Sequence, residues 1–185
     1  GRVDCLETDN AIKHWKAEGL DLTPILTPAQ RPHDQVDVYC QIKQDHGLDK
    51  ALDNELVKQS QPALERGEPV QFELPIVNTN RTVGTILSHH LAKRWGQEGL
   101  PDDTIHIKLH GSAGQSFGAF LAHGVTLELE GDGNDYVGKG MAGGKLVIRP
   151  PNGSPFKSQE TAIIGNTCLY GATGGKLVAA GTAGE

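Results

Sequence analysis

Glycine-punctuated repeats dominate residues 111–185 and constrain the fold of this chain more than any other feature. Three times, a run rich in Gly ends in a pair of residues that is followed directly by a short, largely apolar segment. The first two pairs lie 20 residues apart and the next two 31 apart, because an insert rich in turn-forming residues spans 150–160. The pairs are His123-Gly124, Gly143-Gly144 and Gly174-Gly175, and the segments after them are 125–129, 145–148 and 176–179.

A repeat of about 20 residues has the length of one coil of a solenoid. Dense Gly disfavours an α-helix by up to ~1 kcal/mol per residue, whereas it permits the positive φ and close backbone approach that the corners of stacked coils need. Apolar and polar residues alternate in 125–130, so one face of this strand would enter a core that stacked coils share. The pattern predicts a β-solenoid, and an antiparallel β-sandwich with glycine turns is the alternative.

The first part of the chain predicts short helices and extended segments instead of repeats. Asn10 is a candidate cap for a short helix that includes residues 15–16. Pro residues in 22–28 bias their predecessors away from helix, so this stretch is expected to be an extended linker. Apolar and polar residues alternate in 36–42, which predicts a strand.

Four further elements are predicted before the repeats. Leu recurs every four residues in 48–56, which indicates a helix that Pro62 interrupts. Residues 70–74 alternate and predict a strand. Residues 83–95 place apolar side chains on one stripe and form the clearest helical pattern of the chain. Residues 104–110 alternate and predict a strand that leads into the repeats.

Several stretches carry a resemblance to a known enzyme family. They include GNDYVGKGMAGGKLVIRPP, IIGNTCLYGATGGKLVAAGTAGE and PIVNTNRTVGTILSHHLAKRWG. These stretches resemble the glycine-rich repeat region at the C-terminal end of the glutamate synthase large subunit, and the resemblance covers nearly all 185 residues. It implies a right-handed β-helix without catalytic residues. A weaker resemblance is to the β-helix component of formylmethanofuran dehydrogenase, which shares the glycine repeat.

Together these observations predict a mainly β chain that forms one domain. Residues 104–185 are expected to form the right-handed β-helix, truncated at its C-terminus. Residues 1–103 are expected to be the linker and helix-containing part of the same domain, with a mixed α and extended structure. The only Met is Met141, so the chain opens without a start residue and we expect a fragment.

The last repeat, 165–180, is followed by no polar cap of the kind that ends natural solenoids. We therefore expect an open end whose strand edge exposes the apolar residues Leu177 and Val178. Such an edge predicts self-association of the chain at high concentration.

No sequence pattern indicates a catalytic, cofactor-binding or metal-binding residue. Residues 138–143 fit the dinucleotide motif GxGxxG, and Glu160 stands 20 residues after Gly140, but no apolar strand leads into the motif and no helix follows it. Residues 133–140 nearly match a P-loop, but the Ser or Thr is missing and Asp135 would repel phosphate. We expect these glycines to form corners.

The histidine, cysteine and acidic residues are also considered as metal ligands or reactive groups. His106 and His110 share a strand face but lie roughly 13 Å apart, and the adjacent His89 and His90 diverge by ~100° on a helix, so solvated or hydrogen-bonded histidines are expected. One acidic turn is a candidate calcium site, but the EF-hand spacing is missing. A solvated acidic corner is therefore expected there. That turn gathers Glu128, Glu130, Asp132 and Asp135. The three cysteines form no C-x-x-C pair and are expected to be reduced thiols; they are Cys5, Cys40 and Cys168.

The resemblance implies a structural role between the domains of an enzyme that makes L-glutamate from L-glutamine and 2-oxoglutarate with electrons from NADPH or ferredoxin. Its FMN and iron–sulfur cluster would bind to other domains, and its partners would be those domains, a small subunit or ferredoxin. The net charge of −6 argues against nucleic acid, and no apolar run approaches the ~20 residues that span a membrane, so a cytoplasmic protein is expected. The alternative is a polysaccharide-acting β-helix enzyme. Its groove would use Glu128, Glu130, Lys145, Arg149 and Lys176.

Overall fold

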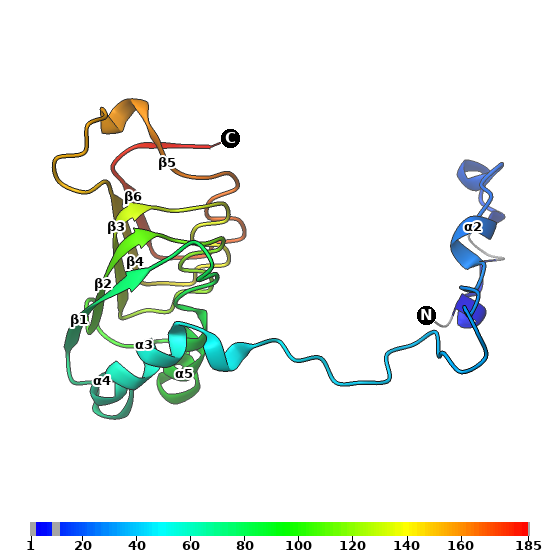
Figure 1. Cartoon of the computed structure of the whole chain (residues 1–185), viewed down its shortest axis with the longest axis horizontal. Helices are drawn as coiled ribbons and strands as arrows, with labels where there is room; N and C mark the ends of the chain where they lie inside the picture. The colour runs from blue at the N-terminus through cyan, green and yellow to red at the C-terminus, as the bar shows by residue number, and fades with distance from the viewer. Residues whose placement is uncertain (1–2, 9–11, 185) are drawn as a thin grey trace. The chain divides into compact units, whose positions relative to one another are not determined.

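The computed structural model describes residues 3–8 and 12–184. Asn10, the expected helix cap, lies outside the described residues. The chain divides into two units, Gly1–His46 and Gly47–Glu185, which we call the N-terminal unit and the sheet unit (Figure 1). The division at residues 103 and 104 that the sequence suggested stays a prediction.

The N-terminal unit is built from short turns of helix and irregular chain. Its helices are η1 (Val3–Cys5), η2 (Trp15–Ala17) and α2 (Thr23–Leu26). The expectation of a purely extended linker over 22–28 is wrong, because Pro24 falls in the first turn of α2, where a missing N–H leaves no helical bond unmade. The prediction of a strand over 36–42 is also wrong. These residues form no strand, because none of the described strands lies beside them to pair with.

The sheet unit opens with helices that surround its first strand. These elements are η3 (Leu48–Lys50), α3 (Asp53–Gln59), α4 (Gln61–Arg66), β1 (Val70–Ile76) and α5 (Thr85–Trp95). Gly67 ends α4 in a left-handed conformation at φ 69°, which a residue without a Cβ adopts at little cost. The periodic patterns had predicted the strand and both longer helical regions. The predicted interruption at Pro62 is confirmed, since α3 ends at Gln59 and Pro62 lies in the first turn of α4.

Parallel strands form the rest of the sheet unit. They are β2 (Ile105–Ser112), β3 (Val125–Asp132), β4 (Lys145–Arg149), β5 (Ala162–Ile164), β6 (Lys176–Ala179) and β7 (Thr182–Ala183), with η4 (Ser158–Glu160) before β5. One sheet has the order β1-β2-β3-β4-β6, and β5 and β7 pair in a second sheet (Figure 1). The predicted strands at 125–129, 145–148 and 176–179 are therefore confirmed.

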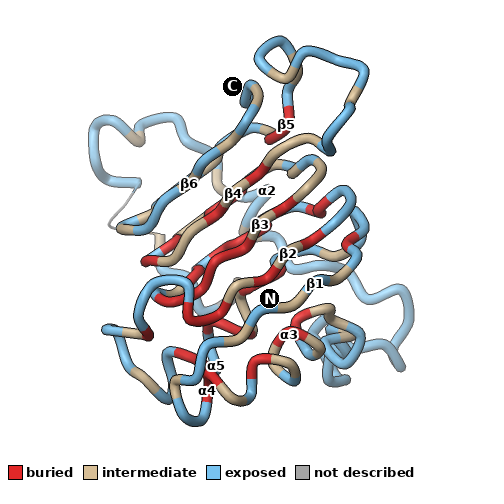
Figure 2. The backbone as a smooth tube through the Cα atoms, turned by 90° about the vertical axis from the view of Figure 1, so that its left-hand side faces the viewer, coloured by how far each residue is buried: buried red, intermediate tan, exposed pale blue. Residues whose placement is uncertain are grey.

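The register of the main sheet stacks equivalent repeat positions on one another. Leu127 lies beside Leu146, and Leu146 beside Leu177. Each repeat therefore adds an apolar side chain to the same row. Burial follows the rows in β2, β3 and β4, as Figure 2 shows. The 31-residue spacing seen in the sequence is the offset between β4 and β6, whereas β3 and β4 are offset by 19 residues, one fewer than the spacing of the first two pairs.

The expectation of a mainly β, right-handed β-helix is wrong. The structure is an α/β fold, in which five parallel strands form the main sheet and helices α3, α4 and α5 complete its core (Figure 2). The fully buried Leu56 and Leu91 of these helices belong to the same hydrophobic cluster as Leu127 of β3. Sequence periodicity reports each element separately, so it assigned the helices to a segment beside the repeats and not to the repeat core.

The segments between the strands, 113–124 and 133–144, are turns that repeat the same backbone geometry. Residues at matching places in successive turns share left-handed φ values: Ser116, Tyr136 and Thr167 at 61°, 61° and 56°, and Gly124, Gly144 and Gly175 at 94°, 71° and 95°. Backbone bonds join neighbouring turns; the Phe120 N–H donates to the Lys139 carbonyl, and the Gly140 N–H to the Tyr170 carbonyl, both at 2.8 Å. The glycine pairs do occupy equivalent corners, as the sequence indicated.

Strand β6 lies at one edge of the main sheet. Val178 is 56% exposed there, but Leu177 is half-buried against the core, so only one of the two apolar side chains expected at this edge is exposed. Strand β7 follows β6 and pairs with β5, so the repeat at 165–180 is not the last paired segment. Self-association through this edge stays a prediction. Among the described residues, no helix combines the length and apolar character that crossing a membrane requires.

Candidate functional site

The outward face of the main sheet carries a dense group of charged side chains, which we call the charged sheet face. Along each strand its residues alternate with buried ones, so the pleat separates them from the core. The group consists of Glu73, His106, Lys108, His110, Glu128, Glu130, Lys145 and Arg149. It contains all the residues named above for a polysaccharide-acting enzyme except Lys176.

Arg149 joins the two glutamates of β3. Its Nη2 lies 2.7 Å from Glu130 Oε2 and 3.3 Å from Glu128 Oε1. The side chains are only partly exposed, at 20% for Glu128 and 26% for Glu130. His106 Nε2 lies 3.4 Å from the second oxygen of Glu128 but makes no hydrogen bond of good geometry. Both carboxylates are therefore engaged by one guanidinium, and Glu130 also lines a cavity of about 460 Å³ beside His110 and Phe156.

Glu73 on β1 pairs with two basic side chains of β2. Its carboxylate lies 3.1 Å from His110 Nε2 and 3.7 Å from Lys108 Nζ. The hydrogen bond with His110, and then the charge of Lys108, hold the pKa of Glu73 below its ordinary value. The expectation of a hydrogen-bonded histidine is confirmed for His110.

Asp103 holds Lys145 at the start of β4. The Lys145 Nζ donates to both carboxylate oxygens at 2.9 Å, and the Thr126 hydroxyl donates at 2.6 Å. These bonds, the one from Lys145 first, lower the pKa of Asp103. A cavity of about 200 Å³ lies beside them and is also lined by Lys176. The arrangement pairs Lys145 with Asp103 and leaves the second candidate, Lys176, exposed at the edge strand.

Replacing Arg149 with Met is expected to lower the free energy of unfolding by about 1 kcal/mol at low salt, because Glu128 and Glu130 would then repel each other without a counter-charge. Added salt should reduce the loss by screening. Urea unfolding of both proteins measures it. Arg66→Met is the control: Arg66 lies 2.7 Å from Glu68, but both side chains are 55% exposed, so its loss should be near zero. Equal losses would contradict the assignment of Glu128, Glu130 and Arg149 as one network.

The glycine motif does not build a nucleotide site in the structure. Residues 138–143 lead into strand β4, so no helix begins there. Their N–H groups serve the stacked turns: Gly138 donates to the Phe117 carbonyl and Gly140 to the Tyr170 carbonyl. The near-P-loop is used in the same way, since the Tyr136 N–H donates to the Asn166 carbonyl at 2.9 Å. These groups are therefore not presented together to a phosphate.

The acidic turn is divided among separate partners. Glu128 and Glu130 face Arg149, Asp132 accepts a hydrogen bond from the Ser112 hydroxyl, and Asp135 accepts one from the Asn166 N–H. Within residues 3–8 and 12–184 no three His, Cys, Asp or Glu side chains are placed to hold a metal ion. That this chain contributes no catalytic, cofactor-binding or metal-binding residue stays a prediction.

The remaining candidate residues lie apart from one another. His89 and His90 contact each other edge to face on the exposed side of α5, with ring centres 5.5 Å apart. Cys40 donates to the Ile42 carbonyl and Cys168 to the Gly165 carbonyl. Burial raises the pKa of Cys168, which disfavours its thiolate, the reactive form of cysteine.

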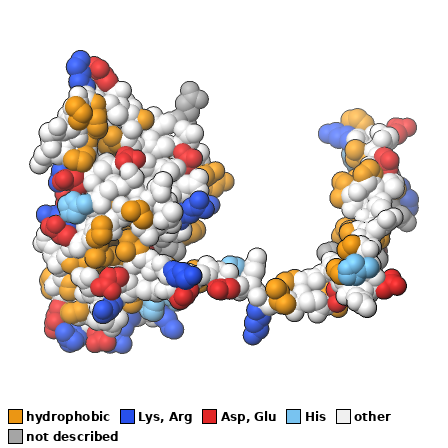
Figure 3. All heavy atoms as spheres, in the orientation of Figure 1, with side chains coloured by type: hydrophobic (Ala, Val, Ile, Leu, Met, Phe, Trp, Pro, Cys, Tyr) orange, Lys and Arg blue, Asp and Glu red, His pale blue; other side chains and the backbone are white. Residues whose placement is uncertain are grey.

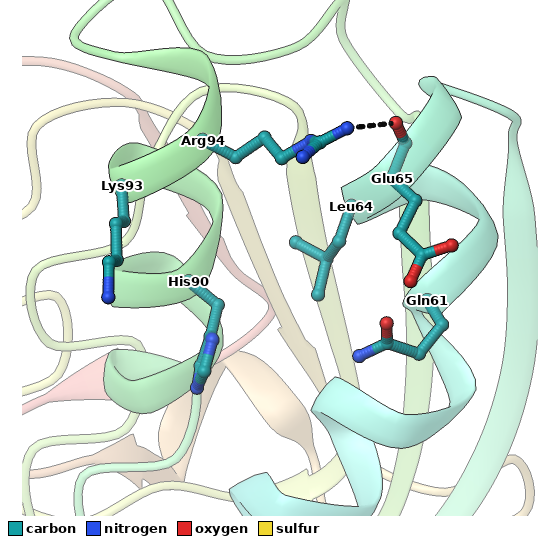
Figure 4. A pocket seen from close by; sticks show the side chains of 6 residues that line it. All are labelled: Gln61, Leu64, Glu65, His90, Lys93 and Arg94. Carbon is teal, nitrogen blue, oxygen red and sulfur yellow. Dashed lines mark hydrogen bonds between the residues drawn. The ribbon is translucent and has the colours of Figure 1, made fainter.

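A cavity of about 460 Å³ lies between α4 and α5 (Figure 4). Its lining consists of Gln61, Leu64, Glu65, His90, Lys93 and Arg94. Arg94 crosses the gap and donates to the Glu65 carbonyl at 3.0 Å, as the dashed line in Figure 4 shows. Beside it the Trp95 indole donates to the Leu64 carbonyl at 2.9 Å. These bonds tie the two helices together, which is a structural use of the polar lining.

Sequence reasoning missed Asp53, the most deeply buried acidic side chain described, at 3% exposed. Its carboxylate accepts hydrogen bonds from the N–H groups of Gly84, Ile86 and Leu87, at the start of α5. Burial raises the pKa of Asp53, and these bonds oppose the rise. The partners lie 31 to 34 residues away in the sequence, so no local motif could have revealed them.

Comparison with known proteins places this arrangement in a family. The pattern of the family described as "GXGXG motif" matches residues 53–185, which is most of the chain and nearly all of the sheet unit. The chain belongs to the GXGXG motif family. In this GXGXG domain, glycines recur in the turns between the strands of the sheet unit.

Relatives of the GXGXG chain include large glutamate synthases from three organisms. It is 54% identical over 185 residues to "Glutamate synthase [NADH]" of Schizosaccharomyces pombe, covering 100% of this chain and 9% of the relative. It is 44% identical to the NADPH large chain of Bacillus subtilis over 187 residues, and 41% identical to ferredoxin-dependent glutamate synthase 2 of Synechocystis over 188 residues. Each of these two matches covers 100% of this chain and 12% of the relative. The chain thus spans about a tenth of the length of the curated relatives it matches.

Proposed function

We propose that this chain serves as a non-catalytic, structural domain of a glutamate synthase large chain, at its C-terminal end. The observation that carries the proposal is the match over the whole chain at 54% identity to a relative about ten times as long. In this proposal the domain acts by holding other domains in place.

The chemistry of the sheet unit supports this role. Arg149, Glu73 and Asp103 pair with neighbouring charges on the sheet face. The N–H groups of the glycine turns are consumed by neighbouring turns. The charged groups that pair with one another in this way are not available to a substrate. The polysaccharide-acting alternative is disfavoured, because two of its residues, Glu128 and Arg149, bind each other.

The names of the relatives support placing the redox groups elsewhere. Enzymes named for NADH, NADPH and ferredoxin all match 100% of this chain, so the same domain accompanies different electron donors. We infer that FMN and the iron–sulfur cluster bind to other domains of the parent enzyme, in the cytoplasm. Its partners are then those domains, and a small subunit or ferredoxin acts through them. The sheet unit would supply the rigid surface, and the N-terminal unit the connection to it.

The isolated chain is expected to be catalytically inert. Purified protein should release no ammonia from L-glutamine and should retain no flavin absorbance after incubation with FMN and gel filtration. The physical reason is that the N–H groups of the glycine turns, which would have to bind the FMN phosphate, donate to neighbouring turns. The Schizosaccharomyces pombe enzyme provides the positive control in both assays.

Ammonia release or bound flavin above background would overturn the proposal. A circular dichroism spectrum with both helix and sheet signals must accompany the assays, so that inertness is measured on folded protein.

A further inference from the structure

One asparagine of the chain is followed by glycine, at Asn152-Gly153 in the insert that precedes β5. The backbone nitrogen after an asparagine can attack its side-chain carbonyl carbon, because the two atoms close a succinimide ring within one molecule. A Cβ on the attacking residue hinders this approach, and Gly has none. Asp132-Gly133 has the same pattern with a carboxyl group in place of the amide. The sequence therefore offers two candidate sites, and the structure distinguishes them.

Gly133 is held in place in the folded chain. Its N–H donates to the Ile163 carbonyl at 2.7 Å, and a Cβ added to it would lie 3.1 Å from a methyl carbon of Val137. The Asp132 carboxylate accepts a hydrogen bond from the Ser112 hydroxyl at 2.7 Å. The attacking nitrogen and the group that it would attack are thus both engaged, so the ring cannot close without breaking these bonds.

Gly153 lies instead in an open turn of the insert. The Ser154 N–H and hydroxyl donate to the Pro151 carbonyl at 3.2 and 2.7 Å, and Gly153 has a φ of 82°, the value that the third residue of a type II turn requires. Within the described part of the chain, neither the Gly153 N–H nor the Asn152 side chain makes a hydrogen bond. A Cβ on Gly153 would meet no atom within 4 Å. Both reacting groups of this pair are therefore free to approach each other.

We propose that Asn152 is a site of spontaneous deamidation, which converts it to aspartate and isoaspartate. The Gly153 nitrogen forms a bond to the side-chain carbonyl carbon of Asn152 and gives up its proton to solvent. The bond from that carbon to the side-chain nitrogen breaks, and this nitrogen takes up a proton and leaves as ammonia. Water then opens the succinimide at either carbonyl, so the reaction needs no oxidant, cofactor or partner. The inference is independent of the proposed function.

The reaction changes the charge of the insert and leaves its packing room. Aspartate or isoaspartate at 152 adds a negative charge to a chain whose net charge is −6. Asn152 directly follows Pro151, which lines the cavity that Glu130 and Phe156 also line, so the new carboxylate stands beside an already acidic cavity. The insert projects from the sheet at the top of Figure 1. Figure 3, in the same orientation, shows charged and hydrophobic side chains together on its surface.

Peptide mass spectrometry of the purified chain, kept folded in buffer and sampled over time, tests the site. The peptide with Asn152 is expected to gain the mass that accompanies replacement of NH2 by OH, and to separate into two products on reversed-phase chromatography. Its amide should be lost at least about ten-fold faster than those of Asn54 and Asn80, which are followed by Glu55 and Arg81. A reaction barrier lower by about 1.4 kcal/mol produces that factor.

The same experiment in urea controls for the structural argument. In the unfolded chain Asp132 should form isoaspartate, because the bonds that hold Gly133 and the carboxylate are broken. In the folded chain it should do so at least about ten-fold more slowly. Asn152 should react at nearly the same rate in both states, because its turn holds neither reacting group.

Two substitutions locate the chemistry. Gly153→Ala puts a Cβ on the attacking residue and should slow the loss of the Asn152 amide about ten-fold. Gly171→Ala is the matched control: Gly171 also has a left-handed φ, 67°, and no atom within 4 Å of an added Cβ, but it follows Tyr170. It should therefore bring the same backbone strain without changing the rate at Asn152. Asn152→Gln should abolish the reaction at this position, because the ring would be one atom larger, and should leave the urea midpoint unchanged.

Four results would each overturn the proposal. They are loss of the Asn152 amide no faster than that of Asn54, equal rates in the native chain and Gly153→Ala, a rate at Asn152 that is much slower folded than in urea, and isoaspartate at Asp132 formed equally fast in both states. The proposed function fails on a separate measurement. Deamidation releases at most one ammonia per chain and needs no L-glutamine, whereas a catalytic chain would release ammonia in proportion to added L-glutamine.

Discussion

Replacing Asp53 with Ala is expected to lower the free energy of unfolding of the sheet unit by about 3 kcal/mol. Each buried donor left unpaired costs on the order of 1–3 kcal/mol, and removing the buried carboxylate offsets part of that loss. The Asp53 carboxylate accepts from Ile86 at 2.7 Å, from Leu87 at 3.2 Å, and from Gly84 at 2.8 and 3.1 Å. Alanine would leave these N–H groups in the core without an acceptor. Urea unfolding followed by circular dichroism measures the loss.

Two companion variants make the Asp53 result specific. Asp53→Asn keeps one acceptor oxygen and should lose less than Ala. Asp49→Ala removes an exposed aspartate from η3, just before α3, and should change the midpoint little. An Asp53→Ala protein as stable as the Asp49→Ala protein would contradict the role of Asp53 as the anchor of α5.

The pH dependence of Asp53 follows from the direction of its pKa. Burial raises the pKa in the folded state, so the folded protein binds the proton more tightly than the unfolded chain. Its contribution is therefore full below the ordinary carboxyl pKa and falls as pH rises through the raised value. The difference in stability between the native chain and Asp53→Asn should shrink over that interval. A difference that grows with rising pH would show that the three N–H groups outweigh burial.

Asp53 also shows which part of this fold the sequence could predict. Elements defined by their own periodicity were predicted where they lie: strand β1, helix α5 and the repeat strands β3, β4 and β6. Asp53 and Gly84 meet across 31 residues, and that contact has no signature in either segment. The same limit explains the wrong fold class. The apolar stripes on α3 and α5 were visible in the sequence. Nothing in the sequence indicated that these two helices complete the core of the sheet.

Two local errors have a different cause. Residues 36–42 have the alternation of a strand, but alternation only prepares a segment for pairing, and none of the described strands lies beside it. Residues 23–26 form a helical turn although Pro24 had suggested extended chain, because Pro is restricted after the first turn and not within it. In the candidate site, the sequence placed Glu128, Glu130 and Arg149 on the outward face, but their mutual pairing depends on register.

Replacing Gly144 or Gly175 with Val is expected to lower the free energy of unfolding by about 3 kcal/mol or more, combining backbone strain with overpacking. Both glycines have left-handed φ values, 71° and 95°. A Cβ on Gly144 would lie 2.6 Å from the Val125 carbonyl oxygen, and one on Gly175 would lie 2.6 Å from the Gly143 carbonyl oxygen. These oxygens belong to the first residue of β3 and to the neighbouring turn, which cannot move away without breaking the backbone bonds that join successive turns.

Gly153→Val separates the two contributions to this loss. Gly153 lies in the insert and also has a left-handed φ, 82°, but a Cβ there would meet no atom within 4 Å. Its variant should therefore show backbone strain alone, about 1–2 kcal/mol. Urea midpoints of the three variants measure the difference, and Gly144→Ala keeps the Cβ contact while removing the β-branch. Equal midpoints for Gly144→Val, Gly175→Val and Gly153→Val would mean that strain alone is at work, and that the close approach of successive turns does not require glycine at these corners.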